Sequence, residues 1–276
     1  MTFSLVARDP ETGRLGVAVA TCALAVGRAV PWAQAGVGAI ATQATTHRGY
    51  GARGLAMLAK GVPPDMVLAR LCDQDDAAAQ RQVGMVDASG RIAVWSGRGC
   101  LSACGHLTGD GFTAQGNMLA SRSVVPSLVE GYLDASGDFC DRLVAGLSAA
   151  QEAGGDLRGR QSAALLVVAG ERGAESWEGV LVDLRVDDAN DPVRELSRLL
   201  RLQRAYESSD HETLAGEAPE GLRDLHAALG AAHRGDRDTA AEALRTLRQR
   251  PGWDGWQRRM RTSGKMPGTN SLLDLE

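Results

Sequence analysis

Two runs of small apolar residues place the strongest constraint on the fold of this chain. LGVAVAT at 15–21 and GVGAIATQA at 36–44 have the continuous apolar pattern of strands that are covered on both faces. Their alanines and glycines indicate that another layer packs closely on them. TFSLVAR at 2–8 alternates as a strand does, and the turn residues DPETG that follow it predict a tight hairpin with 15–21.

The rest of the chain predicts a mixed order of strands and helices up to about residue 188, followed by helices alone. Helices are expected at 50–61, at 63–76 and, with a break, from about 118 to 151, and strands on both sides of the Ser89-Gly90 turn, at 161–170 and at 177–188. In the second helix, Met66, Leu68 and Leu71 are expected to face inward. The pattern predicts an α+β main domain at 1–205 and a small helical domain at 206–276, with a helical hairpin that turns at 234–236.

Composition excludes several classes of protein. The chain has 276 residues, 44% of them hydrophobic, which is enough to build a substantial core. Its formal charge of -4 gives no electrostatic reason to expect nucleic acid as a partner. The sequence has no secretion-signal pattern and no apolar run of membrane-spanning length. Its five cysteines are an odd number, which argues against a disulfide framework. We therefore expect a cytoplasmic protein that binds neither nucleic acid nor membrane.

Thr2 directly follows the initiator methionine. A threonine hydroxyl is a weak nucleophile, but the α-amine of an N-terminal threonine can serve as its base, because the reference pKa of that amine is roughly 7.7–8.0. Threonine is also small enough for ordinary removal of Met1. Thr2 is therefore either the first residue of a catalytic chain or simply the second residue of a strand.

Seven segments together resemble a family of predicted N-terminal-nucleophile-type hydrolases, the domain of unknown function 1028. The resemblance covers about residues 1–205, and residues 207–276 are similar to the peptidoglycan-binding-like extension of longer members. It implies a four-layer αββα sandwich, with two antiparallel sheets between helical layers. The segments are MTFSLVARDPETGRLGVAVAT, VPWAQAGVGAIATQA, YGARGL, QVGMVDASGRIAVWSG, AQGNML, GGDLRGRQSAALLVV and DLRVDDANDPVREL.

Several residues are candidates to act with Thr2. Asn117 could cap a helix, or its amide and the N–H of Gly116 could stabilise an oxyanion. Thr21 and Gln43 are expected near Thr2 across the sheet.

GGDLRGRQS at 154–162 is the most unusual stretch of the sequence. Asp156, Arg160 and Gln161 either hold an acidic substrate in this loop or form a polar turn around a structural arginine–aspartate pair.

The other polar residues are weaker candidates for a functional site. Cys100, Cys104 and His106 lack the fourth ligand of a zinc site, and His211, His226 and His233 are expected at the surface. The sequence has no phosphate-binding loop and no dinucleotide fingerprint, so no cofactor is expected, and no metal is expected because the zinc ligands are incomplete. The lysines are Lys60 and Lys265, and neither is predicted to lie in a strand.

The sequence therefore predicts a hydrolase of small amides or related C–N bonds, with a small-molecule substrate. The alternative is a non-catalytic binding protein with the same sandwich. Sandwiches of this type often associate, so we expect a homo-oligomer in which Trp32 helps to cover an interface.

Overall fold

The computed structural model describes residues 2–101, 103–175, 177–253, 255 and 259. The chain divides into two compact units, Met1–Ser197 and Arg198–Glu276. This division falls inside helix α5 (Pro192–Ser208), eight residues before the boundary expected from the sequence. No disulfide bond joins any of the five cysteines, all of which lie in the described part of the chain. None of the described helices is long and apolar enough to cross a membrane.

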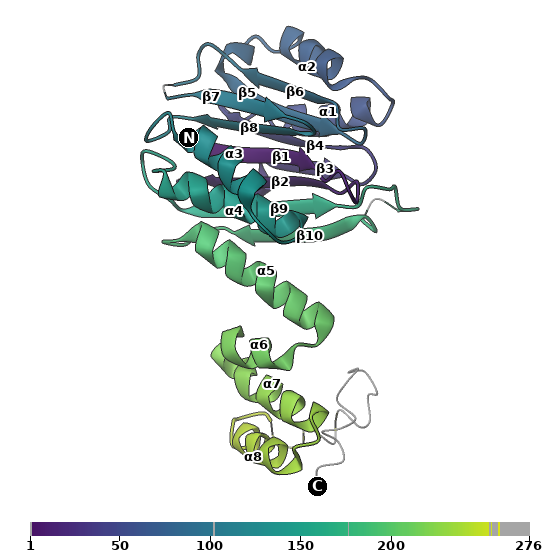
Figure 1. Cartoon of the computed structure of the whole chain (residues 1–276), viewed down its shortest axis with the longest axis vertical. Helices are drawn as coiled ribbons and strands as arrows, with labels where there is room; N and C mark the ends of the chain where they lie inside the picture. The colour runs from purple at the N-terminus through teal and green to yellow at the C-terminus, as the bar shows by residue number, and fades with distance from the viewer. Residues whose placement is uncertain (1, 102, 176, 254, 256–258, 260–276) are drawn as a thin grey trace. The chain divides into compact units, whose positions relative to one another are not determined.

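The first unit contains two antiparallel sheets (Figure 1). One sheet has the strand order β10-β9-β2-β1-β8-β7, and the other has the order β3-β4-β5-β6. The expected α+β class with two antiparallel sheets is confirmed. The strands are β1 (Thr2–Arg8), β2 (Leu15–Thr21), β3 (Pro31–Gln34), β4 (Gly38–Ala44), β5 (Arg81–Asp87), β6 (Ile92–Ser96), β7 (Gly105–Gly109), β8 (Phe112–Asn117), β9 (Ser162–Val168) and β10 (Val180–Val186).

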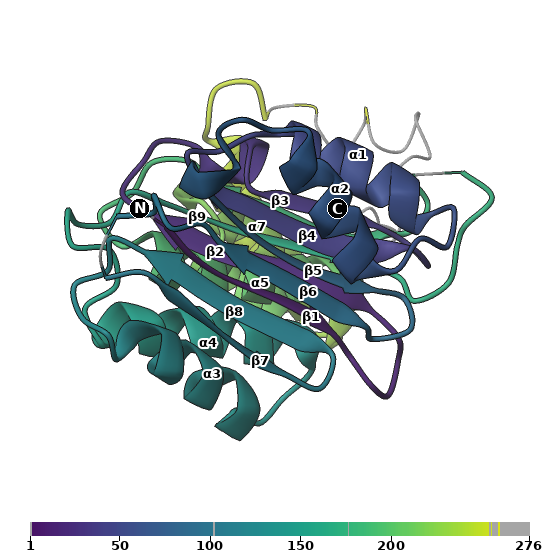
Figure 2. The same cartoon turned by 90° about the horizontal axis from the view of Figure 1, so that it is seen from above.

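Helices cover the outer face of each sheet. α1 (Gly49–Leu58) and α2 (Pro64–Asp73) pack on the smaller sheet, while α3 (Val124–Asp134) and α4 (Phe139–Glu152) pack on the larger one. Figure 2 shows the two helix pairs on opposite sides of the stacked sheets. The sheets bury an apolar core between them, to which β1, β2, β4 and β5 contribute valine, leucine and alanine side chains.

Small residues allow these layers to approach closely, as the sequence indicates. Every residue of β2 is buried. A Cβ atom on Gly16 of β2 would lie 2.7 Å from a methyl group of Leu143 in α4. On the other sheet, a Cβ atom on Gly51 of α1 would lie 2.2 Å from the ring of Trp32. The Trp32 ring is therefore packed against α1 within the chain.

Three expectations about the elements of the first unit are wrong. Helix α3 begins at Val124 and not near Met118, because Met118 takes a left-handed conformation (φ 51°) and the Leu119 N–H donates to the Ala103 carbonyl at 3.0 Å instead of joining a helix. The polar, glycine-rich residues 105–117, for which no strand was expected, form the β7–β8 hairpin, whose turn contains Asp110 and Gly111. In α2, Val67 is buried while Met66 is 46% exposed, because proline at position 64 begins the helix and sets its rotation.

The second unit contains α6 (His211–Glu217), α7 (Glu220–His233) and α8 (Arg237–Arg248). The expected hairpin is present: Gly235 takes a φ of 78° in the turn between α7 and α8, and Leu225, Leu229, Leu244 and Leu247 form its core. One expectation is wrong, since His226 is only 6% exposed. Its ring stacks on that of His211 and lies beside Tyr206.

Candidate active site

The ends of several strands meet at one end of the two-sheet sandwich. Thr2 begins β1, and Asn117, its cross-strand partner, ends β8. Thr21 ends β2 on the other side of β1. The hydroxyl of Ser4 donates to Gln43 Oε1 in the other sheet at 2.7 Å, so Ser4 faces the space between the sheets. Because side chains alternate along a strand, Thr2 faces the same space.

Thr2 is nearly enclosed, with 7% of its surface exposed. Its hydroxyl donates to the Thr21 hydroxyl at 3.3 Å, and its carbonyl oxygen accepts from Gln43 Nε2 at 3.3 Å. Thr21 lies near Thr2 in the same sheet, as expected, whereas Gln43, also expected near Thr2 across that sheet, reaches it from the other sheet. Met1, whose removal would free the Thr2 amine, lies outside the described residues.

Gln82 is the centre of a buried polar network that sequence analysis did not foresee. Its Oε1 accepts from Gln43 Nε2 and from Asn117 Nδ2, both at 2.8 Å. Its Nε2 donates to the carbonyl of Gly116 at 2.9 Å and to Ser96 Oγ at 2.9 Å. Gln82 is fully buried, so it fixes the side chains of both sheets relative to each other.

The position of Gln82 leaves a signal in the sequence. It is a glutamine directly before the apolar residues 83–86 of β5, and Gly84 follows two residues later on the same face. A Cβ atom on Gly84 would lie 2.3 Å from Gln115 Oε1 and 2.4 Å from Thr113 Oγ1. A glutamine and a glycine at successive inward positions indicate that polar side chains of the opposite sheet enter this space.

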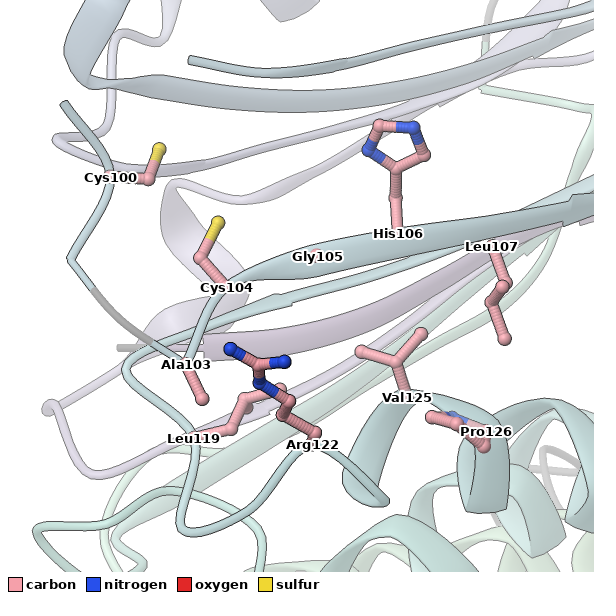
Figure 3. A pocket seen from close by; sticks show the side chains of 10 residues that line it. All are labelled: Cys100, Ala103, Cys104, Gly105, His106, Leu107, Leu119, Arg122, Val125 and Pro126. Atoms are coloured by element: carbon pink, nitrogen blue, oxygen red, sulfur yellow. The ribbon is translucent and has the colours of Figure 1, made fainter. Parts of the chain in front are cut away.

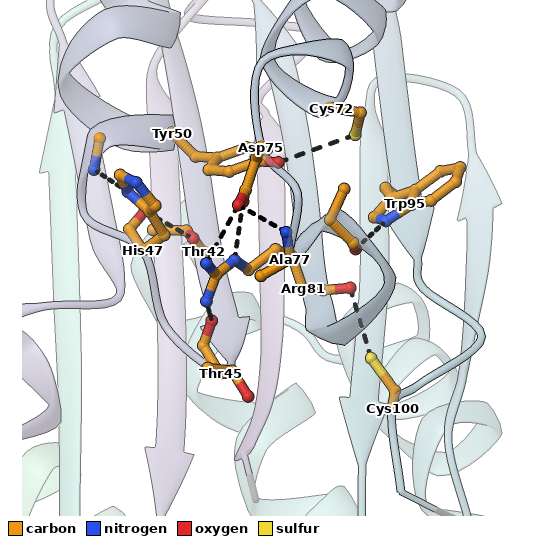
Figure 4. A network of polar contacts seen from close by, with 12 residues as sticks. Thr42, Thr45, His47, Tyr50, Cys72, Asp75, Ala77, Arg81, Trp95 and Cys100 are labelled. Carbon is orange, nitrogen blue, oxygen red and sulfur yellow. Dashed lines mark hydrogen bonds and ion pairs between the residues drawn. The ribbon is translucent and has the colours of Figure 1, made fainter.

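An ion pair beneath the site fixes the start of β5 (Figure 4). Arg81 donates to both carboxylate oxygens of Asp75, at 2.8 and 3.2 Å, and to the carbonyl of Thr45 at 2.6 Å. The hydrogen bond from Arg81 holds the pKa of Asp75 well below its usual range. Since Arg81 directly precedes Gln82, this pair helps to hold Gln82 in place.

Backbone strain is concentrated at the same end of the sandwich. Ala44 (φ 69°), Met118 (φ 51°) and Ala25 (φ 54°) adopt left-handed conformations. Ala44 directly follows Gln43, and Met118 directly follows Asn117. For a residue with a Cβ atom this conformation costs roughly 1–2 kcal/mol, and such strain is typical of functional sites.

The loop at 154–162 lies against the end of β2. Asp156 Oδ2 accepts from the Cys22 N–H at 3.0 Å, and Asp156 Oδ1 accepts from the Arg158 N–H at 2.9 Å. The Gln161 N–H donates to the Thr21 carbonyl at 2.9 Å. Asp156 is 4% exposed, so in the structure its carboxylate fastens this loop to the residue beside Thr21.

A polar cavity of about 500 Å³ opens beside this loop. Arg160 lies 3.6 Å from Asp191, and the Gln161 side chain donates to Asp188 at 3.0 Å. The two arginines of the cavity therefore lie near carboxylates, Arg160 near Asp191 and Arg158 near Asp156, while Asp188 accepts from a neutral amide. Its lining residues are Cys22, Arg158, Gly159, Arg160, Gln161, Asp188, Ala189 and Asn190.

The described residues place neither a metal-ligand cluster nor Lys60 beside Thr2. Within the described part of the chain, no three His, Cys, Asp or Glu residues are placed to hold a metal ion. Lys60 follows the end of α1, where Leu58 packs on Gly38, the first residue of β4. Gln43, which contacts Thr2, lies near the opposite end of β4. Lys60 is therefore at the other end of the sandwich from Thr2.

Comparison with known proteins places the first unit in a family. A family model described as "Family of unknown function (DUF1028)" matches residues 2–196. A crystal structure of a DUF1028 protein from Silicibacter pomeroyi is 33% identical, with a TM-score of 0.66, and the match covers 74% of this chain and 88% of that chain. The BPH protein of Thiobacillus denitrificans, solved in complex with epoxomicin, is 15% identical, with a TM-score of 0.32, over 61% of this chain and 98% of that chain. No curated protein matches the chain. This chain therefore belongs to the DUF1028 family, whose function is unknown.

Proposed function

We propose that this protein is an N-terminal-nucleophile hydrolase of small amides or related C–N bonds, in which Thr2 attacks after Met1 has been removed. The observation that carries the proposal is the meeting of Thr2, Thr21 and Asn117 between two sheets, near a polar cavity. The order of layers, from helices through two sheets to helices, supports it, because that is the αββα arrangement of this hydrolase class.

The chemistry follows from a free amine next to the hydroxyl. As Thr2 Oγ1 forms a bond to the carbonyl carbon, its proton passes to the Thr2 α-amine, and the carbonyl electron pair moves to oxygen. The C–N bond then breaks, and the amine returns the proton to the leaving nitrogen. Water hydrolyses the resulting ester on Thr2, with the same amine as base, and the free enzyme is restored.

The neighbouring residues have separate roles in this mechanism. Asn117 uses one N–H of its amide to donate to Gln82, and its second N–H is the proposed donor to the oxyanion. The Gly116 N–H is a second candidate donor. Loss of one such donor lowers kcat by about 10²–10³ in well-studied hydrolases. Thr21 orients the nucleophilic hydroxyl.

The polar cavity would hold the substrate through Arg160 and Gln161. Arg160 is about half exposed, with its guanidinium near Asp191, and it cannot relay a proton, so its role is electrostatic. Asp156 positions the loop that carries both residues, because its carboxylate holds Cys22 and Arg158.

A non-catalytic binding protein is the second candidate. The observation in its favour is that Thr2 is 7% exposed and does not line the polar cavity. In that case Met1 would remain on the mature chain, and ligand binding would not depend on the Thr2 hydroxyl.

The test is hydrolysis of a panel of small amides and N-acyl amino acids by the wild type and a set of variants. Thr2→Ala should be folded and inactive, while Thr2→Ser should retain activity. A lysine inserted between Met1 and Thr2 should block methionine removal and abolish turnover, although the threonine hydroxyl is still present.

Thr113→Val is the matched control for these variants. Thr113 is a fully buried threonine in the same space, but its hydroxyl has no hydrogen-bond partner among the described residues. The activity of Thr113→Val should equal that of the wild type. Full turnover by folded Thr2→Ala, or by the lysine-insertion variant, would overturn the proposed mechanism.

A further inference from the structure

A second cavity, of about 480 Å³, lies where β7 and α3 begin (Figure 3). It shares no lining residue with the polar cavity beside Thr21. Leu119, which lies two residues after Asn117, forms part of its wall. The described residues that line it are Cys100, Ala103, Cys104, Gly105, His106, Leu107, Leu119, Arg122, Val125 and Pro126.

Arg122, an exposed residue, brings a positive charge to this cavity. In Figure 3 its guanidinium is directed toward Cys104, among the lining residues. Within the described part of the chain, Arg122 has no ion pair and no hydrogen bond to its guanidinium, whereas Arg158 and Arg160 of the polar cavity lie near Asp156 and Asp191. The lining contains no aspartate or glutamate, and neither does the first turn of α3.

The other polar groups of the lining are neutral near pH 7. Burial raises the pKa of the Cys100 thiol and raises that of Cys104 to about 11. Burial lowers the pKa of His106, whose Nδ1 lies 2.9 Å from Ser96 Oγ. The lining therefore presents a single formal charge, and that charge is positive.

The remainder of the wall is largely apolar. In Figure 3, Leu107, Val125 and Pro126 lie together on one side of the cavity, and Leu119 lies below Ala103 on the other side of Arg122. Leu107 is 42% exposed, so its side chain has apolar surface available to a ligand. A few polar groups in an otherwise apolar cavity of this size are typical of small-molecule sites.

We propose that this cavity binds a small organic monocarboxylate, with the carboxylate on Arg122 and the apolar body against Leu107, Leu119 and Val125. A guanidinium matches a carboxylate through two parallel N–H bonds. A phosphate ion would satisfy the charge but would leave the apolar wall uncovered. A neutral apolar molecule would cover the wall but would leave the guanidinium without an anion. The site does not use Thr2 and stands whether or not Thr2 is a nucleophile.

The experiment compares three probes by isothermal titration of the full chain: hexanoate, the neutral isostere hexanamide, and inorganic phosphate. Hexanoate should bind more tightly than either of the others. Arg122→Gln should weaken hexanoate binding by about tenfold or more, since a hydrogen bond to a charged group is lost. The same variant should leave hexanamide binding unchanged.

Two further variants make the result decisive. Arg70→Gln is the matched control, because it removes an exposed arginine of α2 that lines neither cavity, and it should bind hexanoate as the wild type does. Val125→Trp should fill the cavity and abolish binding of hexanoate, with its fold checked by circular dichroism. Equal hexanoate affinity of the wild type and Arg122→Gln would overturn the proposal. So would absence of hexanoate binding at millimolar concentration, or phosphate binding as tight as that of hexanoate.

Discussion

Replacement of Gln82 by methionine tests whether the polar network between the sheets holds the site together. Methionine has nearly the shape of glutamine but can neither donate nor accept these hydrogen bonds. Asn117 Nδ2 would lose its acceptor, which lies at 2.8 Å, and the Gly116 carbonyl would lose its donor at 2.9 Å. Gln43 Nε2 would retain only its longer contacts, at 3.3 and 3.4 Å.

The expected loss of stability can be estimated from the polar groups that lose their hydrogen-bond partner. Each buried polar group left without a partner costs roughly 1–3 kcal/mol. Two such groups, partly offset by the more apolar side chain, predict that Gln82→Met lowers the free energy of unfolding by about 3 kcal/mol. Gln74→Met is the matched control, because Gln74 is exposed after the end of α2. It should change stability by less than about 0.5 kcal/mol.

Urea unfolding followed by circular dichroism measures this difference. Hydrogen exchange of the peptide that contains β8 shows where the stability is lost, because amides near Asn117 should exchange faster in Gln82→Met than in the wild type. If Gln82→Met and Gln74→Met unfold at the same urea concentration, the network does not stabilise the site, and the reasoning about Gln82 fails.

Three further predictions concern the supports of the fold. Asp75→Asn should cost about 3–5 kcal/mol in urea unfolding, because it leaves a buried arginine unpaired, while the exposed Asp73→Asn should cost little. Since the folded-state pKa of Asp75 is lowered, the ionised carboxylate stabilises the fold at pH values above its unfolded pKa of roughly 3.9, and this stabilisation is lost as the pH falls further. Identical acid unfolding of Asp75→Asn and the wild type would contradict this. Gly51→Ala should cost roughly 1–3 kcal/mol, because its methyl group meets the Trp32 ring, and an unchanged melting temperature would be the contrary result. Burial lowers the pKa of His226, so the second unit should lose stability as the pH falls below about 6.5. His226→Gln should reduce that pH dependence in thermal melts, and equal dependence in both proteins would rule out His226 as its source.

The inner strands could be predicted from the sequence because burial on both faces leaves a direct pattern of small apolar residues. β2 and β4 have that pattern, and their positions confirm it. β8 does not, because its inward positions are Thr113, Gln115 and Asn117, which belong to the polar network. The Asp110-Gly111 turn was the available signal for the β7–β8 hairpin.

The candidate site could be predicted only in part. The proximity of Thr2 and Thr21 follows from strand order, because the ends of adjacent antiparallel strands must meet, whereas Gln43 reaches Thr2 from the other sheet. Gln82 could not be assigned a role in this way, since its partners Gln43 and Asn117 are 39 and 35 residues away in the sequence and belong to different sheets. Its importance depends on how the two sheets stack, which no local pattern encodes.

The central claim is that the Thr2 hydroxyl reacts with the help of its own free amine. The most direct measurement is peptide mass mapping after brief exposure to p-nitrophenyl acetate, an activated ester that acylates reactive nucleophiles. We predict that the first peptide begins at Thr2 and gains one acetyl group there, and that this label is absent from the Thr2→Ala variant and from the variant with a lysine inserted after Met1. A first peptide that still carries Met1, or equal labelling of the wild type and the inserted variant at Thr2, would contradict the account.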